Sequence, residues 1–284
     1  MKKLIKTLKK STATAKLGLI ITAIWIFCAI FAPLLAPYGP NEVNTSKRFI
    51  PPIFAEKGTN EHILGTDEMG RDVLTRIIYG SRISLIVGIM AVVVSLILGT
   101  TLGLLAGYYG GWVDSIIMRI VDVMLSFPFI FMALVLMAVL GSGLTNVIVV
   151  IGITGWVPYA RTVRAQTLSL KEREFITASD TIGCNDMRII LKHILPNIID
   201  SAIILGTPEM SSAILSEASL TFLGMGIPPS MATWGSMVAS GREYIYTAWW
   251  ITALPGLAIF LVCLAINFVG DWVRDVRDPR LRST

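Results

Sequence analysis

The sequence predicts an all-α polytopic membrane protein with six transmembrane helices and a cytoplasmic two-helix loop. Hydrophobic residues make up 54% of the 284 residues and charged residues only 15%, whereas a typical soluble domain contains about 25% charged residues. The mean hydropathy of +0.70 reflects the same imbalance. The net charge of +5 does not arise from one basic face, so nucleic-acid binding is not indicated. The basic residues instead lie between apolar segments, as orientation signals do.

Six segments are apolar over most of the roughly 20 residues that a membrane-spanning helix requires. They lie near Leu17–Pro37, Ile83–Tyr108, Val123–Leu140, Thr145–Tyr159, Ile198–Leu223 and Ala248–Val269. The first segment, residues 17–37, follows a basic tail at residues 1–16 and could instead be a cleaved signal peptide. Because the apolar region of a signal peptide is only about 7–15 residues long, we expect the segment to be retained as an anchor. Pro128 is expected to kink the third segment.

The distribution of lysine and arginine predicts that both chain termini lie in the cytoplasm. With the N-terminus inside, 17 of the 24 basic residues fall on the inner side and 7 on the outer side, in agreement with the positive-inside rule. Residues 271–284 then form a cytoplasmic tail and residues 38–82 an external loop. The end of that loop, "LGTDEMGRDVLTRIIYGSRISL", is predicted to be an interfacial helix that Thr66 or Asp67 caps and that turns into the second span at Gly80.

A polar stretch, "ITASDTIGCNDMRIILKHILPNI" at residues 176–198, interrupts the apolar second half of the chain. The spacing of apolar residues predicts two short amphipathic helices, one over about 168–182 and one that Asp186 caps. Gly183 supplies the turn between them, since glycine tolerates positive φ, and Pro196 is expected to end the second helix. With the predicted orientation, both helices lie on the cytoplasmic side. A plain connecting loop is the alternative.

The stretch resembles the EAA loop of permease subunits in bacterial ABC importers, whose pattern is Glu-Ala-Ala, three residues, Gly, nine residues and Ile-x-Leu-Pro. The matching positions here are Thr177, Ala178, Ser179, Gly183, His193, Leu195 and Pro196. The spacing is intact, but threonine replaces the glutamate, serine the second alanine and histidine the isoleucine. The resemblance implies a coupling loop at about residues 165–197. Its segment Thr177–Asp180 and the following turn would contact an ATPase subunit, without a carboxylate at position 177.

Longer blocks extend the resemblance over most of the chain from residue 61 onward. They include "MRIVDVMLSFPFIFMALVLMAVLGSGLTN", "SEASLTFLGMGIPPSMATWGSMV" and "PGLAIFLVCLAINFVGDWVRDVRDPR", and they are similar to the second permease of dipeptide, oligopeptide and nickel importers. This resemblance implies a five-helix core at residues 83–270 that pairs with a sister permease in the bacterial inner membrane. Two cytoplasmic ATPase subunits would drive transport. An external binding protein would deliver peptides, or else nickel, a metal–chelator complex or glutathione.

The sequence shows no catalytic or nucleotide-binding motif of its own. It contains no G-x-x-x-x-G-K-[ST] motif and not one Gly-Lys pair, so we expect ATP to be bound by partner subunits. The spacing of histidine and cysteine does not indicate a metal site, and no constellation indicates a membrane enzyme. A stand-alone channel or secondary transporter is the alternative from another class. It would need a charged ring or paired broken helices, which the sequence pattern does not show.

Two carboxylates, Glu209 and Glu217, lie in the fifth apolar segment, where an ionisable residue suggests a function by default. They are separated by about 80° around an ideal helix. They could contact a peptide amine or a cationic ligand in the translocation pathway. Alternatively, they could make structural hydrogen bonds with neighbouring helices, and the sequence leaves both possibilities open.

Overall fold

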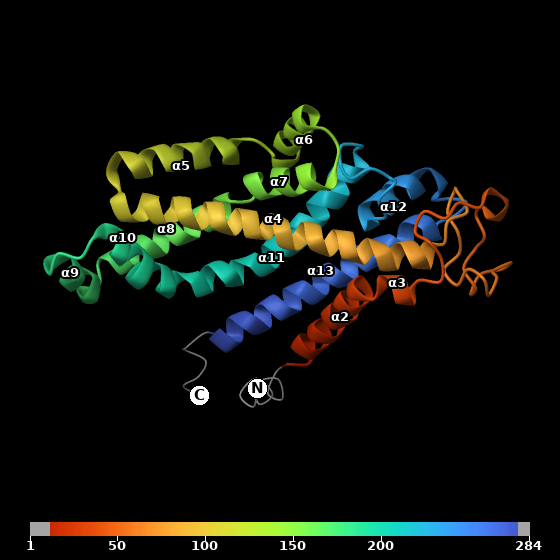
Figure 1. Cartoon of the computed structure of the whole chain (residues 1–284), viewed down its shortest axis with the longest axis horizontal. Helices are drawn as coiled ribbons and strands as arrows, with labels where there is room; N and C mark the ends of the chain where they lie inside the picture. The colour runs from red at the N-terminus through yellow and green to blue at the C-terminus, as the bar shows by residue number, and fades with distance from the viewer. Residues whose placement is uncertain (1–11, 278–284) are drawn as a thin grey trace.

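The computed structural model describes residues 12–277, and most of these residues are helical. The α-helices are α2 (Ala13–Ile30), α3 (Ala32–Leu35), α4 (Val73–Tyr109), α5 (Gly111–Ser126), α6 (Phe129–Leu140), α7 (Leu144–Thr154), α8 (Val157–Lys171), α9 (Glu174–Thr181), α10 (Asp186–Ile189), α11 (Leu195–Phe222), α12 (Trp234–Gly241) and α13 (Trp250–Arg277). The long helices run roughly along the longest axis of the molecule (Figure 1). α9 and α10 lie at one end of this axis, and the loop of residues 38–72 lies at the other.

The predicted number of membrane spans agrees with the structure. Within residues 12–277, five helical stretches are long and apolar enough to cross a membrane: Ala13–Ile30, Val73–Tyr109, Leu144–Lys171, Asp186–Phe222 and Trp250–Val276. The pair α5 and α6 passes the same test only when taken together, which gives up to six spans. The fourth span extends well beyond its predicted end at Tyr159, because α8 continues the path of α7 to Lys171.

The third predicted span is a sharply broken helix, since α5 and α6 meet at 96°. Phe127 between them is extended, with φ −106° and ψ 135°, as expected for a residue that precedes proline. Pro128 then occupies the N-cap of α6. α5 begins at Gly111, well before the predicted start of this span. The apolar pattern missed this first part because it contains Asp114, whose carboxylate is paired with the guanidinium of Arg164 on α8 at 2.5 and 2.6 Å.

The predicted helix at the end of the external loop begins later than expected. Thr66 and Asp67 do not cap a helix, because they lie in a turn that an antiparallel bridge between Thr66 and Asp72 closes. The Asp72 carboxylate instead caps α4 by accepting a hydrogen bond from the first turn of that helix at 2.8 Å. The predicted turn at Gly80 is also absent, and α4 continues through it. A Cβ at Gly80 would lie 3.0 Å from Trp234, so glycine here permits close packing.

α4 is the central helix of the fold. Each of the four buried apolar clusters contains residues of α4. Three glycines on this helix let α8 approach it closely: a Cβ at Gly99, Gly103 or Gly107 would lie 2.5, 2.6 or 2.7 Å from atoms of residues 156–167. Small residues spaced by four are the usual means of close helix packing in membranes.

A buried ionic network holds the loop of residues 38–72 against the start of α4. The Asp67 carboxylate accepts a hydrogen bond from Nε of Arg71 at 2.6 Å. Nη1 of Arg76, on α4, donates to the carbonyl oxygen of Pro40 at 3.0 Å. Arg71 and Arg76 are only 5% and 1% exposed, so protein groups and not water must satisfy these charges.

Candidate functional site

The polar stretch forms two short helices joined by a glycine turn, as the sequence predicts, but the first begins at Glu174 and not near residue 168, because α8 ends at Lys171 and a turn follows it. α9 ends at Thr181, and Gly183 follows with a φ of +80°. A Cβ at Gly183 would meet nothing within 4 Å, so glycine is required for its backbone conformation and not for space. Asn185 begins the second helix by accepting a hydrogen bond from the backbone N–H of Met187 at 3.1 Å. Figure 1 shows α9 and α10 together at one end of the molecule.

Two further details of the predicted loop are wrong. The cap of α10 is Asn185 and not Asp186, and Pro196 does not end the second helix. Pro196 lies at the start of α11, directly after a π-helical turn at Ile190–Ile194, and the helical path passes through it. The helical path therefore continues from the loop into α11 and ends only at Phe222.

The residues of the predicted coupling loop fall into two groups. The first group lies on α9 and the turn that follows it: Thr177, Ala178, Ser179, Asp180 and Gly183. The second group lies where the loop passes into α11: His193, Leu195 and Pro196. The side chains of Thr177 and Ala178 are exposed, whereas those of His193 and Leu195 are half-buried. Thr177 and Ala178 are therefore accessible to a partner, and the second group forms the base of the loop.

The apolar residues of the loop divide between a buried and an exposed side. The buried side consists of Ile176, Ile189, Ile190 and Ile194, which pack in one cluster with residues of α4 and α8. The exposed side consists of Phe175, Ile182, Met187 and Leu191, which are 46%, 79%, 58% and 53% exposed. The apolar spacing predicts one face made of Leu168, Phe175, Ala178 and Ile182, and this prediction is wrong because all four side chains are exposed. The predicted face of the second helix is partly right, since it contains two of the buried isoleucines and two of the exposed side chains. Exposed apolar side chains gathered on a projecting unit indicate a contact surface.

Tyr108, near the C-terminal end of α4, makes hydrogen bonds with the last residue of α8 and with the first residue of α10. Its hydroxyl donates a hydrogen bond to Oδ1 of Asp186 at 2.9 Å, and its carbonyl oxygen accepts one from Nζ of Lys171 at 2.7 Å. A cation near a helix C-terminus is also favoured by the helix dipole. Tyr108 therefore fixes the end of α8 and the start of α10 relative to α4. Local sequence patterns did not indicate this long-range contact.

Glu217 is integrated into the packing of two helices. It is 1% exposed, and its Oε1 accepts hydrogen bonds from the hydroxyls of Thr221 at 2.9 Å and Thr233 at 3.2 Å. The Thr233 hydroxyl also accepts a hydrogen bond from the backbone N–H of Ser236 at 2.9 Å and so caps α12. These bonds connect α11 to the start of α12.

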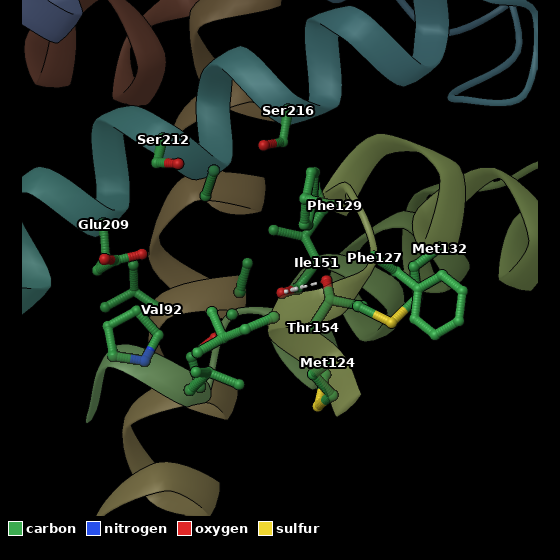
Figure 2. Close-up of a pocket in the computed structure, with 17 residues that line it drawn as sticks. Val92, Met124, Phe127, Phe129, Met132, Ile151, Thr154, Glu209, Ser212 and Ser216 are labelled. Carbon is green, nitrogen blue, oxygen red and sulfur yellow. Dashed lines mark hydrogen bonds between the residues drawn. The ribbon is translucent and has the colours of Figure 1, made fainter. Parts of the chain in front are cut away.

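Glu209 lies instead on the wall of a cavity of about 350 Å³ between α4, the α5–α6 break, α7, α8 and α11. Figure 2 shows Glu209, Ser212 and Ser216 on one side of this cavity, along successive turns of α11. Apolar side chains line the other side: Met124, Phe127, Phe129 and Met132. Glu209 makes no hydrogen bond or ion pair with any residue of the described chain, 12–277.

These features define a class of protein: a helical membrane protein in which a projecting loop continues into a helix that lines a cavity. Residues 99–283 match the family described as "binding-protein-dependent transport system inner membrane component". Residues 6–52 match the N-terminal TM domain of oligopeptide transport permease C. The chain belongs to this family of inner-membrane permease subunits of ABC importers, and it is a transport protein and not an enzyme. The resemblance seen in the sequence is confirmed.

Curated relatives match nearly the whole chain. The di/tripeptide transport system permease protein DppC of Pseudomonas aeruginosa is 44% identical over 94% of this chain and 88% of the relative. The dipeptide transport system permease protein DppC of Alkalihalophilus pseudofirmus is 45% identical over 98% of this chain and 89% of the relative. The glutathione transport system permease protein GsiD of Pectobacterium atrosepticum is 42% identical over 91% and 84%, respectively.

A solved structure supports the fold independently. The chain aligns with the MetNI methionine ABC transporter in an inward-facing conformation with a TM-score of 0.57 and 20% sequence identity. The alignment covers 72% of this chain and 97% of the solved chain. At this identity the likeness establishes the helical arrangement of an ABC transporter chain and nothing about the substrate.

Proposed function

We propose that this chain is a permease through which an ABC importer takes up di- and tripeptides. The observation that carries the proposal is the identity of 44–45% over 94–98% of the chain to relatives named as dipeptide or di/tripeptide permeases. The glutathione permease relative favours glutathione, which is itself a tripeptide, as the second candidate. Both substrates require the same kind of pathway, and an external binding protein selects between them.

The importer contains a sister permease and two cytoplasmic ATPase subunits beside this chain. In this arrangement α9, the Gly183 turn and α10 insert into an ATPase subunit. Support comes from the exposed apolar side chains of Phe175, Ile182 and Met187 on that unit, since apolar side chains are enriched at protein contacts. Of the two ends of each helix, the start of α2 and the end of α13 are the ones nearer to α9 and α10 along the longest axis (Figure 1). This supports a cytoplasmic location for both termini.

The contacts of the loop also support a mechanical role. Tyr108 fixes the loop to the central helix through Lys171 and Asp186, and the loop continues into α11 without a break. Binding and hydrolysis of ATP change the shape of the ATPase pair. A loop held at both ends converts that change into a shift of α4 and α11, so that two packings of the helices alternate.

Uptake of radiolabelled alanylalanine by cells with and without the gene tests this function. Deletion should abolish uptake that depends on ATP, and restoring the chain should recover it. An affinity tag on the chain should recover a sister permease and ATPase subunits from detergent extracts. Uptake that survives deletion, or a chain that transports alone without ATPase subunits, would contradict the proposal. Uptake of radiolabelled glutathione, but not of alanylalanine, that deletion abolishes would select the second candidate.

A further inference from the structure

The two carboxylates of α11 have different surroundings. Glu217 accepts two hydrogen bonds and has no access to the cavity surface. Glu209 is half-buried, lines the cavity and has no hydrogen-bond partner or ion-pair partner within residues 12–277. An ionisable residue at membrane depth is costly and is usually paired or faces a watery cavity or pathway. The fold accounts for Glu217 but not for Glu209.

The location of the cavity indicates a route for a polar solute. It lies beside the extended link at Phe127 and Pro128, where α5 and α6 meet at 96°. Non-helical backbone is tolerated at membrane depth only where protein buries it or where it lines a cavity, and broken helices in transporters surround the substrate. A volume of about 350 Å³ is also within the range of small-molecule sites.

The two walls of the cavity differ in chemistry. Glu209, Ser212 and Ser216 are spaced at i, i+3 and i+7 on α11, so they form one polar row about 10 Å long. Methionine and phenylalanine side chains form the opposite wall, and methionine adapts to apolar groups of different shape. Near this row, the hydroxyl of Tyr159 is buried without a hydrogen-bond partner among residues 12–277, and it lies 3.5 Å from the position of a Cβ on Gly206, one turn before Glu209.

We propose that Glu209 receives the α-ammonium group of a peptide as it passes through the permease, and that Ser212 and Ser216 offer the next hydrogen bonds along its path. The assignment rests on the proposed function and names residues of that pathway. An ammonium group is common to all short peptides with a free amino terminus, whereas their side chains differ. A carboxylate facing an adaptable apolar wall suits such a set of substrates. Several weak polar contacts in a row also let a solute move on.

The first test compares uptake of alanylalanine by complete transporters that carry Glu209→Gln, Glu209→Asp or Glu56→Gln. Glu56 is an exposed carboxylate of the external loop and serves as the matched control. Loss of one charge-assisted hydrogen bond predicts that Glu209→Gln lowers the maximal rate about tenfold. Glu209→Asp should retain most of the rate, and Glu56→Gln should have no effect. Recovery of the ATPase subunits with each variant reports assembly.

A second test does not depend on uptake. Ser212→Cys is introduced into a chain whose native cysteines are replaced by alanine, and the thiol is labelled with cationic and anionic methanethiosulfonates. The negative charge of Glu209 should make the cationic reagent react roughly fivefold faster than the anionic one, and Glu209→Gln should remove this preference. Ser219→Cys, on the same helix but outside the cavity lining, is the control and should show no such dependence on Glu209.

The outcomes separate the two proposals. If the unaltered transporter takes up no alanylalanine, the proposed function fails, and this assignment fails with it. If it takes up the peptide and Glu209→Gln is equally fast, only the assignment of Glu209 is overturned. Loss of the assembled complex in Glu209→Gln would give this residue a structural role against the sister permease and would also overturn it. Equal labelling rates of Ser212→Cys with the cationic and the anionic reagent would also overturn the assignment of Glu209.

Discussion

Single glycines in this chain have two distinct physical roles. Gly103 lies in a helix and leaves room for a neighbouring backbone, since a Cβ there would lie 2.6 Å from the carbonyl oxygen of Ala160. Gly183 lies in a turn with open space around it and adopts a φ of +80° that residues with a side chain avoid. A substitution at the first position creates a steric clash, and one at the second position creates backbone strain.

Gly103→Val should destabilise the packing of α8 on α4 by about 1–3 kcal/mol, which is the usual cost of overfilling a packed interface. The measurement is the thermal midpoint of the purified complex. Gly256→Val is the matched control, because Gly256 also lies within a helix and a Cβ there would meet nothing within 4 Å. Equal midpoints for the two variants would show that the close approach at Gly103 contributes nothing to stability.

Gly183→Val should impair transport through backbone strain of about 1–2 kcal/mol, which the loop can relieve only by changing the angle between α9 and α10. Membrane insertion should be normal, while peptide uptake per ATP hydrolysed should fall. Gly183→Asn is the matched control, since asparagine tolerates the same left-handed conformation. If both variants transport at the unaltered rate, the shape of the turn is not important for coupling.

At the scale of elements, the loop and α11 behave as one unit because of contacts distant in the sequence. The hydroxyl of Tyr108 reaches Asp186, and the carbonyl oxygen of Tyr108 accepts a hydrogen bond from Lys171. α4 therefore holds the loop at its entry and at its second helix. The exposed side of the loop remains available to a partner while its buried side is fixed.

Tyr108→Phe should loosen the loop without unfolding the permease. The change removes one hydrogen bond, which contributes about 1 kcal/mol, and it leaves the ring and the backbone contact to Lys171 in place. Amide hydrogen exchange of residues 182–190 should accelerate several-fold, with little change in the thermal midpoint. Tyr109→Phe is the control, because that ring is 47% exposed and its hydroxyl makes no hydrogen bond within residues 12–277. Identical amide hydrogen exchange in both variants would show that the Tyr108 hydroxyl does not hold the loop in place.

Sequence patterns predicted the helices and the turn of the loop well, but they predicted the contacts between helices poorly. Apolar length gave the number of spans, and Gly183 gave the turn of the loop, because both depend on local chemistry. The G-x-x-x-G-x-x-x-G spacing from Gly99 to Gly107 was also present in the sequence and could have predicted the close pair α4 and α8. The angle at Pro128 could not be read in advance, since proline permits a bend without setting its size.

In the candidate site, too, the sequence predicted local elements but not the contacts between residues distant in the chain. The two carboxylates of α11 could not be assigned from helical spacing, because that spacing leaves open which helix faces each one. Only the packed structure places Thr233 beside Glu217 and a cavity beside Glu209. The partner of Asp186 is 78 residues away at Tyr108, a distance at which a pattern in a single sequence carries no information.

At the scale of the whole molecule, the two ends of the bundle are stabilised differently. The end with α9 and α10 exposes apolar side chains, whereas the opposite end buries charges. There the carbonyl oxygen of Thr66 also accepts a hydrogen bond from Nε1 of Trp250 at 3.0 Å, which connects the loop of residues 38–72 to α13. This loop is therefore a fixed part of the core, although it contains little helix.

Arg71→Met should destabilise the protein by about 3 kcal/mol, because it removes the cation that bonds the buried carboxylate of Asp67 and the half-buried one of Glu68. Both Asp67 and Glu68 accept hydrogen bonds from Arg71, at 2.6 and 2.8 Å. The thermal midpoint should fall markedly. Arg48→Met, at an exposed position in the same loop, should change the midpoint little, by less than about 0.5 kcal/mol. A small effect for both would mean that the network is not required to hold the loop.

Pro208 lies within α11, immediately before Glu209, and it has no backbone N–H to donate to the preceding turn. The bending stiffness of the 37-residue path from Asp186 to Phe222 is therefore reduced next to the cavity. A force on the loop end of this path would bend α11 more easily at Pro208 than it would bend an uninterrupted helix. Under the proposed mechanism, movement of the loop would thus change the shape of the cavity wall that carries Glu209.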